Sequence, residues 1–271
     1  ERAKKLTSRH SAAAIALPQF FGTSQVTDFA PEPDDAILRQ MVDFKTQQMG
    51  GLSDESYIYD FRRNQPDRER ANPVFILLSR ETTINEYLDT VAKAGLDFSE
   101  AAMSGIGVLN ALAELHPECR SGRGLQIVLD IGAENTVMAI LAGGDILLLS
   151  SLNFGNRRFV QTLASSLEID EARAEKKLAE TRLSDSYELA PLLDTAQTLL
   201  NEVIHACEQW RAMEPPESGE RPVERIWLCG GGACLAGLGE FLQRHFGCPA
   251  TAFGPPGPDG PRNAIFRART T

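Results

Sequence analysis

The sequence predicts an α/β protein of two lobes, in which a small α+β unit precedes a larger sheet-and-helix lobe. The first observation is length, because a single hydrophobic core usually stops growing at about 250 residues and this chain has 271. The second is a series of three short apolar segments, 126–130, 136–141 and 146–152, whose separating turns predict a strand meander. The third is the run of helical patterns that follows, closed by a strand, a glycine turn and a helix.

The first third of the chain is expected to form the small mixed unit. An apolar strand over 12–17 ends before Pro18, and a strand over 24–29 is its expected partner. A helix over 34–49 carries an apolar face of Ile37, Leu38, Met41, Val42 and Phe44. The remaining elements are strands 57–61 and 73–79, a helix over 84–94 that ends before Gly95, and a further extended stretch.

The second part of the chain continues from the meander into helices. The patterns predict helices over 157–167, 171–181 and about 187–213, a polar linker over 214–222, a strand over 225–229 and a helix over 238–246. We therefore expect a first-lobe remnant with an inserted α+β subdomain over 12–103, a nucleotide-binding lobe over 104–253, and a Gly/Pro-rich tail over 254–271.

Charge and composition exclude several classes of function. The formal net charge of −10 argues against binding to nucleic acid or anionic lipid, since both depend on basic patches. No apolar stretch approaches the ~20 residues that a membrane span requires, and no signal segment is evident, so we expect a cytoplasmic protein without direct membrane insertion. Its five cysteines are scattered without a CxxC pair, so neither a disulfide framework nor a zinc site is indicated.

A polar turn interrupts the apolar pattern at the end of the first meander strand. Asp130 ends that strand, which is where open α/β sheets place ligand-binding groups. Gly132 and Ala133 let the backbone approach a ligand, successive amides of such a turn can bind an anion, and Thr136 adds a hydroxyl. A carboxylate beside phosphate suits Mg²⁺ binding or the orientation of a water molecule. The alternative is a plain hairpin in which Asp130 accepts turn hydrogen bonds.

A second glycine turn follows the last long strand. Gly230, Gly231 and Gly232 leave the backbone bare where a base or ribose could lie, and Ala233 opens the next helical turn. Taken alone this pattern is weak, because tightly packed strand-to-helix junctions are also rich in glycine.

Together and in this order, the two turns resemble those of the actin, sugar kinase and Hsp70 ATPase superfamily, which has a D-x-G-x-x-x-T hairpin and a later G-G-G/A adenosine turn. Here these are "DIGAENT" (130–136) and "GGGA" (230–233). More narrowly, residues 125–178 and 223–250 are similar to the PilM family of type IV pilus assembly proteins, which is related to the division protein FtsA. The segment 74–98 is similar to the subdomain that this family inserts into its first lobe. The resemblance implies an actin-like, ribonuclease H-like lobe.

The resemblance also implies roles for particular residues. Asp130, Gly132, Ala133, Glu134, Asn135 and Thr136 would form the second phosphate loop for ATP with Mg²⁺, Asp130 being the catalytic and metal-binding group. Gly230, Gly231, Gly232 and Ala233 would lie along the adenosine. Gly155 would face the nucleotide, although Asn156 replaces the second glycine of the family pair. Glu175 and Lys176 would approach the ribose and base, or else form a solvated charged helix face.

Two further features qualify this interpretation. The superfamily clamps ATP between two phosphate hairpins, and the first of them, near the N-terminus, is not found in this sequence. Either the sequence is a fragment from which the opening strands are missing, or the protein keeps the lobe without the clamp, and from these residues alone we expect at most a weak ATPase. Arg157 and Arg158 begin a helix, where the helix dipole disfavours positive charge. That placement suggests a contact with nucleotide phosphate or with a carboxylate of a partner.

Three functions remain open from the sequence. The first is an actin-like scaffold of the type IV pilus machine that binds ATP between lobes and grips the cytoplasmic tail of an inner-membrane protein such as PilN, with self-association as a further interaction. The second is a sugar-kinase-like phosphotransferase in which Asp130 activates a hydroxyl. The third is an FtsA-like division protein, although the terminal amphipathic helix that such a protein needs at the membrane is not evident.

Overall fold

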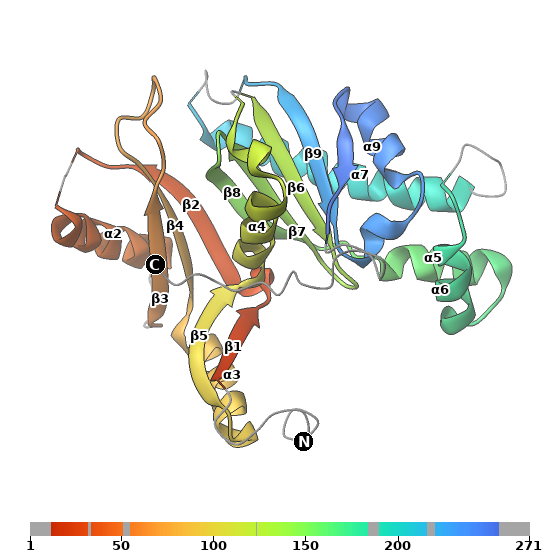
Figure 1. Ribbon diagram of the computed structural model, residues 1–271, viewed down its shortest axis with the longest axis horizontal. Coiled ribbons are helices and arrows are strands. Elements are labelled where there is room, and N and C mark those ends of the chain that lie inside the picture. Colours follow the sequence, from red (N-terminus) through yellow and green to blue (C-terminus); the bar gives the residue numbers. More distant parts are fainter. Residues whose placement is uncertain are drawn as a thin grey trace.

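The computed structural model describes residues 12–31, 34–50, 55–122, 124–183, 190–215 and 220–254, and its elements are arranged as in Figure 1. The described residues form a five-stranded sheet, a three-stranded sheet and a pair of parallel strands. The predicted Gly/Pro-rich tail lies outside the described residues from position 255 onward. None of the described helices combines the length and the apolar character that crossing a bilayer requires.

The five-stranded sheet is the centre of the larger lobe. Its strands lie in the order β10-β9-β6-β7-β8. They are β6 (Leu125–Ile131), β7 (Thr136–Ala142), β8 (Asp145–Leu152), β9 (Val223–Cys229) and β10 (Ala250–Ala252). β6, β7 and β8 form the predicted antiparallel meander, whereas β9 pairs in parallel with β6, and β10 in parallel with β9. This order, with the first meander strand in the middle, is that of a ribonuclease H-like lobe.

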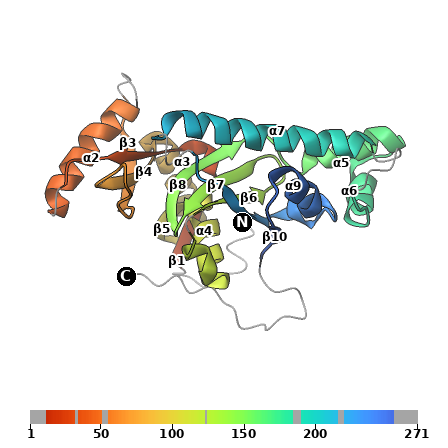
Figure 2. The same ribbon diagram turned by 90° about the horizontal axis from the view of Figure 1, so that it is seen from above.

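Helices cover one face of this sheet. They are α5 (Arg157–Leu167), α6 (Glu171–Ala179), α7 (Ala190–Met213) and α9 (Leu238–Phe246). Figure 2 shows α7 running along this side, with α4 (Ser104–Leu115) on the opposite side. The buried core beneath the helices includes Ile127, Leu129, Met138 and Ile140, alternate residues of β6 and β7 that share one face of the sheet. The predicted helix 187–213 is described from Ala190 onward.

The three-stranded sheet belongs to the inserted unit. Its order is β2-β4-β3, all antiparallel, with β2 (Gly22–Asp28), β3 (Tyr57–Arg63) and β4 (Pro73–Arg80). Helix α2 (Asp35–Met49) packs on one face through Leu38 and Val42, which are fully buried. Ile37 and Phe44, which we placed on the same apolar face, are instead exposed to 45% and 65%. The apolar face of α2 is therefore narrower than predicted.

The strand pairing corrects one prediction. β1 (Ala12–Leu17) does not pair with the next strand in sequence but in parallel with β5 (Asp97–Met103), and β2 pairs with β4 instead. Helix α3 (Glu81–Ala94) connects β4 to β5 and ends at Gly95, whose φ of 71° is the left-handed conformation expected of a helix C-cap. In sequence, the elements from β2 to α3 are therefore inserted between β1 and β5, two strands that pair with each other.

The inserted sheet and α4 cover the second face of the five-stranded sheet. Phe75 of β4 and Leu112 of α4 share a buried core with Val128, Leu149 and Trp227 of the large sheet. Short one-turn helices at Gln19–Phe21 and Pro117–Arg120 complete the connections on this side. The indole of Trp227 also donates a hydrogen bond of 2.7 Å to the Gln126 side chain. The two units are therefore held together by a continuous apolar layer.

Polar contacts extend this junction along the edge strand β8. The Ser24 hydroxyl donates to the Leu149 carbonyl at 2.7 Å and accepts from the Leu149 amide at 3.1 Å. The Asn64 side-chain amide donates to the Ile146 carbonyl at 2.8 Å, and the Gln65 amide donates to the Asp145 carboxylate at 2.7 Å. The side chains of Ser24 and Asn64 thus satisfy backbone groups that the edge of the sheet leaves unpaired, and the Asp145 side chain accepts from the backbone of Gln65.

We expect Ser24→Ala to lower the free energy of unfolding by about 1–3 kcal/mol, because it removes the partner of two backbone groups on buried Leu149. Ser99→Ala is the matched control, since the Ser99 hydroxyl donates to the Ala13 carbonyl at an exposed site, and its cost should stay within about 0.5 kcal/mol. Urea unfolding of both variants measures the difference. Equal losses would contradict the role assigned to Ser24.

Candidate functional site

The two glycine turns lie side by side at the carboxyl ends of β6 and β9 in the large sheet. β6 and β9 are parallel neighbours, and Asp130 is the register partner of Cys229. After β6 the chain turns to β7 on one side, whereas β9 and β10 lie on the other, so the strand order reverses between β6 and β9. In open α/β sheets the crevice at such a switch point is the usual ligand site. The structure therefore brings "DIGAENT" and "GGGA" together at this position.

Two of the three glycines are required by close packing between the turns. Gly230 has a φ of 81°, and a Cβ there would collide with the Asp130 carboxylate and lie 2.6 Å from the Ile131 carbonyl oxygen. A Cβ on Gly232 would collide with the Ile131 side chain. A Cβ on Gly231 would have no atom within 4 Å, and this residue is exposed. Gly231 thus presents bare backbone to open space, as a flat ligand group requires.

The turn after β6 keeps several of its amides unused. Gly132 donates its N–H to the Asn135 carbonyl at 3.0 Å and so closes the turn. Among the hydrogen bonds of the described residues, none is donated by the backbone amides of Ala133, Glu134 or Asn135. Consecutive free amides in a tight turn form a concavity that attracts anions. The geometry therefore suits a phosphate group.

The start of α5 braces this turn from behind. The Asn156 amide donates to the Gly132 carbonyl at 2.8 Å, and the Arg157 amide donates to the Ala133 carbonyl at 2.9 Å. Gly155 is buried against the same backbone, and a Cβ there would collide with the Ala133 carbonyl oxygen. Gly155 thus allows the close approach of α5 to the turn. Its buried position makes it a shaping residue, whereas we had expected it to face a nucleotide.

Asp130 is half-buried at the mouth of the site. Burial raises the pKa of its carboxyl, and a hydrogen bond from the Cys229 thiol offsets part of that rise. Burial and the adjacent Asp130 carboxylate together raise the pKa of the Cys229 thiol, so this cysteine stays protonated and donates. A carboxylate that is costly to ionise gains from a nearby cation, which is consistent with the expected Mg²⁺ ligand.

The structure separates the remaining candidates from the turns. Thr136 is fully buried, and its hydroxyl donates to the Phe154 carbonyl at 2.7 Å, so it fastens β7 to the end of β8 and is not available to a ligand. This corrects our expectation for Thr136. Glu175 and Lys176 lie on the exposed face of α6, and no contact among the described residues joins them to either turn. Their placement fits the solvated helix face that we had kept as an alternative.

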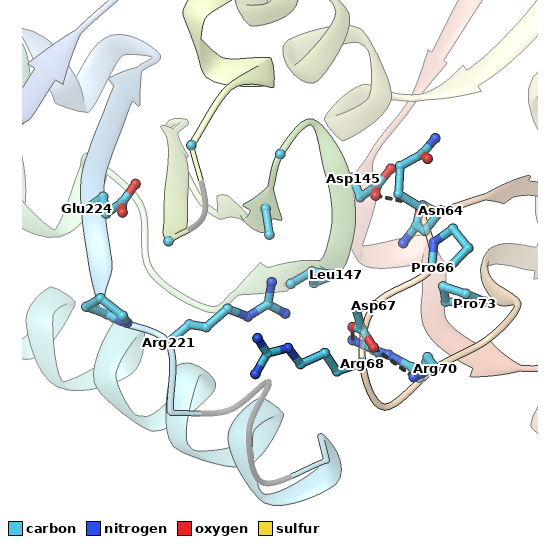
Figure 3. Close-up of a pocket in the computed structure, with 16 residues that line it drawn as sticks. Asn64, Pro66, Asp67, Arg68, Arg70, Pro73, Asp145, Leu147, Arg221 and Glu224 are labelled. Carbon is cyan, nitrogen blue, oxygen red and sulfur yellow. Dashed lines mark hydrogen bonds and ion pairs between the residues drawn. The ribbon is translucent and has the colours of Figure 1, made fainter.

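A cavity of about 890 Å³ lies at the opposite end of the sheet, near the beginnings of β6 and β9 (Figure 3). Arg68 and Arg221 extend into it from opposite walls. The walls carry both signs of charge, from Asp67, Arg68, Arg70, Asp145, Arg221 and Glu224. Arg70 is committed to ion pairs with Asp67 at 3.3 Å and Glu214 at 2.9 Å. The pair with Glu214 connects the inserted unit to the larger lobe, and we do not assign this cavity to nucleotide.

The residues at the switch point fit a magnesium nucleotide. No cluster of three or more metal-ligating side chains occurs among the described residues, so a cation here would be held by Asp130 and by phosphate oxygens. That arrangement is usual for Mg²⁺, which keeps several waters and takes one or two protein carboxylates. The bare face at Gly231 and the free amides at 133–135 supply the complementary surfaces for base and phosphate.

The sheet order and the paired turns define an actin-like protein. The sequence profile described as type IV pilus assembly protein PilM matches residues 1–255. The chain belongs to this PilM family. A sequence search of curated proteins gives no match.

Three solved structures are similar to this chain, and the first of them supports the same fold. The structure titled "PilM-PilN type IV pilus biogenesis complex" is similar with a TM-score of 0.71 and 20% identity, covering 91% of this chain and 70% of that chain. MreB5 of Spiroplasma citri bound to ADP has a TM-score of 0.49 and 19% identity, covering 63% of this chain and 60% of that one. EutJ from Carboxydothermus hydrogenoformans has a TM-score of 0.42 and 20% identity, covering 63% and 55%.

The ion pairs of Arg157 could be predicted only in part from the sequence. Arg157 does contact a carboxylate, but that carboxylate belongs to Glu134 of the same turn, at 2.9 Å, and a second one to Glu171, at 3.5 Å. The unfavourable position of Arg157 at a helix start was the available signal. Spacing of 23 residues gave no indication of the partner.

Asp130→Asn is expected to gain stability relative to the wild type as pH rises. The native carboxyl has a raised pKa, so the native state binds the proton more tightly than the unfolded chain, and wild-type stability falls as pH rises from the ordinary value of 3.8 through the native pKa. Asparagine carries no charge and escapes this loss. Urea unfolding of both proteins from pH 3 to 8 measures it. A stability difference that does not change with pH would contradict the burial of Asp130.

Proposed function

We propose that this protein binds ATP with Mg²⁺ at the switch point between β6 and β9. The observation that carries this proposal is the contact between the two turns, in which Gly230 and Gly232 pack against Asp130 and Ile131. That contact places the exposed backbone of Gly231 and the free amides of residues 133–135 on neighbouring turns. Family membership supports the same conclusion, because the motif order is that of actin-like ATPases.

The residues divide the work by chemistry. The amides of Ala133, Glu134 and Asn135 would hold phosphate oxygens, and Asp130 would hold Mg²⁺ or orient a water molecule. Gly231, with Gly230, Gly232 and Ala233 around it, would lie against the adenosine. We retain Gly132 and Gly155 as the residues that give the turn its shape. Thr136, Glu175 and Lys176 are not part of the proposed contact surface.

We propose a scaffold that is at most a weak ATPase. Nucleotide would then act mainly by setting the relation between the lobes. Membership of the pilus family favours this role over the sugar-kinase and division-protein alternatives.

Gly231→Leu should weaken binding of a fluorescent ATP analogue by at least about tenfold, because its side chain would occupy the bare face without touching the fold. Gly231→Ala should have a smaller effect, and both variants should keep the thermal midpoint of the wild type. Titration with and without Mg²⁺ measures the affinities, and Asp130→Asn should lose the Mg²⁺ dependence. Unchanged affinity in Gly231→Leu would exclude this site.

We propose a second interaction, with the cytoplasmic tail of an inner-membrane pilus protein. The basis is the similar structure whose title names a PilM-PilN complex. This protein would then be cytoplasmic and reach the membrane through that partner. A short tail segment in an extended conformation suits a groove beside a sheet.

A hollow of about 400 Å³ on the inserted unit is our proposed receptor for the tail. It lies between the turn at Gln19–Phe21, the sheet and the beginning of α3, with Phe20, Phe21, Tyr57 and Leu78 among its walls. Phe20 is 54% exposed, although aromatic side chains of this size are normally more buried. Exposed aromatic residues at the rim of a hollow are typical anchors for a peptide.

Phe20→Ala is expected to weaken binding of a synthetic partner tail by at least about tenfold, since a buried aromatic anchor contributes about 2 kcal/mol or more. Phe98→Ala is the matched control, because Phe98 is 47% exposed on β5 and does not line the hollow. Calorimetric titration of both variants gives the affinities. Equal losses would place the tail elsewhere.

A further inference from the structure

Glu134 is an unexpected residue in a turn that attracts anions. Its side chain is 63% exposed. In sequence it follows Ala133, whose backbone amide is one of the three donors without a partner. A carboxylate at this position repels the phosphates that the neighbouring amides would attract. The turn therefore contains one group that opposes the binding we propose for it.

Arg157 is held where it can cancel that charge. Its backbone amide is bonded to the Ala133 carbonyl at 2.9 Å, which fixes the start of α5 against the turn. Its guanidinium Nη1 then reaches the Glu134 carboxylate at 2.9 Å, and its Nε lies 3.5 Å from the Glu171 carboxylate. The helix dipole disfavours a cation at this end of α5, so these two carboxylates account for its position.

We propose that Arg157 is a positioning residue for polyphosphate, which acts by neutralising Glu134 at the mouth of the phosphate turn. The inference rests on the proposed nucleotide site and deepens it. With Arg157 in place the turn presents its amides beside a Glu134 carboxylate that is paired with a guanidinium, which Glu171 also contacts from α6. Without Arg157 it presents the same amides beside an uncompensated negative charge, and the penalty grows with the number of phosphates on the ligand.

The adjacent arginine provides a contrast within the same helix turn. The Arg158 guanidinium lies over the Phe154 ring at 5.3 Å and donates to the Asn153 carbonyl at 2.7 Å. No contact among the described residues joins Arg158 to Glu134. Replacement of Arg158 therefore removes the same charge from the start of α5 without exposing the turn carboxylate. This makes Arg158→Ala a control for general loss of positive charge.

The test is a double-mutant cycle on Arg157 and Glu134, read out by the affinity for ADP, AMP and adenosine at low ionic strength. Arg157→Ala should weaken ADP binding by roughly three- to fivefold, AMP less, and adenosine not at all. The double variant Arg157→Ala/Glu134→Gln should bind ADP as tightly as Glu134→Gln alone. Arg158→Ala should bind as the wild type does, and the effect of Arg157→Ala should shrink as salt is added.

The alternatives give different results. If Arg157 contacted phosphate directly, the double variant would stay as weak as Arg157→Ala, and the proposal would be wrong. Equal losses for adenosine and ADP, or for Arg157→Ala and Arg158→Ala, would also overturn it. If the wild type bound no nucleotide, or Gly231→Leu bound it normally, the nucleotide site itself would fail and this inference with it. Thermal unfolding of every variant separates these effects from loss of folded protein.

Discussion

The parallel pairing of β6 with β9 is the constraint on which the site depends. These strands are almost a hundred residues apart in sequence, yet their register places Asp130 beside Cys229. Because parallel neighbours end at the same edge, each of the turns that follow must pack against the other. The glycines indicate this close packing, because a side chain at Gly230 or Gly232 would collide with Asp130 or Ile131. Without this pairing, neither turn would define a ligand surface.

The turn after β6 is closed by its own Gly132–Asn135 bond and is held in addition by the start of α5. Gly155 lets the beginning of α5 approach, and the amides of Asn156 and Arg157 take up the carbonyls of Gly132 and Ala133. These bonds use the carbonyls of the turn and leave the amides of residues 133–135 without a partner among the described residues. The same attachment carries the Arg157 guanidinium to Glu134. The position of α5 therefore has two effects: its first amides bond the backbone of the turn, and its Arg157 side chain pairs with Glu134.

Local patterns predicted the elements well, and long-range packing accounts for what they missed. The bounds of α5 and α9 agree with the expected helices because apolar periodicity defines both, and the left-handed cap at Gly247 ends α9. The partner of β1 was mistaken, since the inserted unit separates it from β5. We expected Thr136 to contact a ligand, although the strand pattern indicated that it is buried. It lies on the same face of β7 as Met138 and Ile140, which face the helix-covered core. The carboxylates that pair with Arg157 could be identified only from the folded structure of the turn.

The two indoles of the chain lie on opposite faces of the same sheet. Trp210 belongs to the core under the helices, whereas Trp227 lies in the layer shared with the inserted unit and is hydrogen-bonded to Gln126. The protein therefore carries an intrinsic fluorophore in each layer. A variant in which Trp210 is replaced keeps Trp227 as its remaining tryptophan, and its fluorescence reports on the layer that Trp227 shares with the inserted unit.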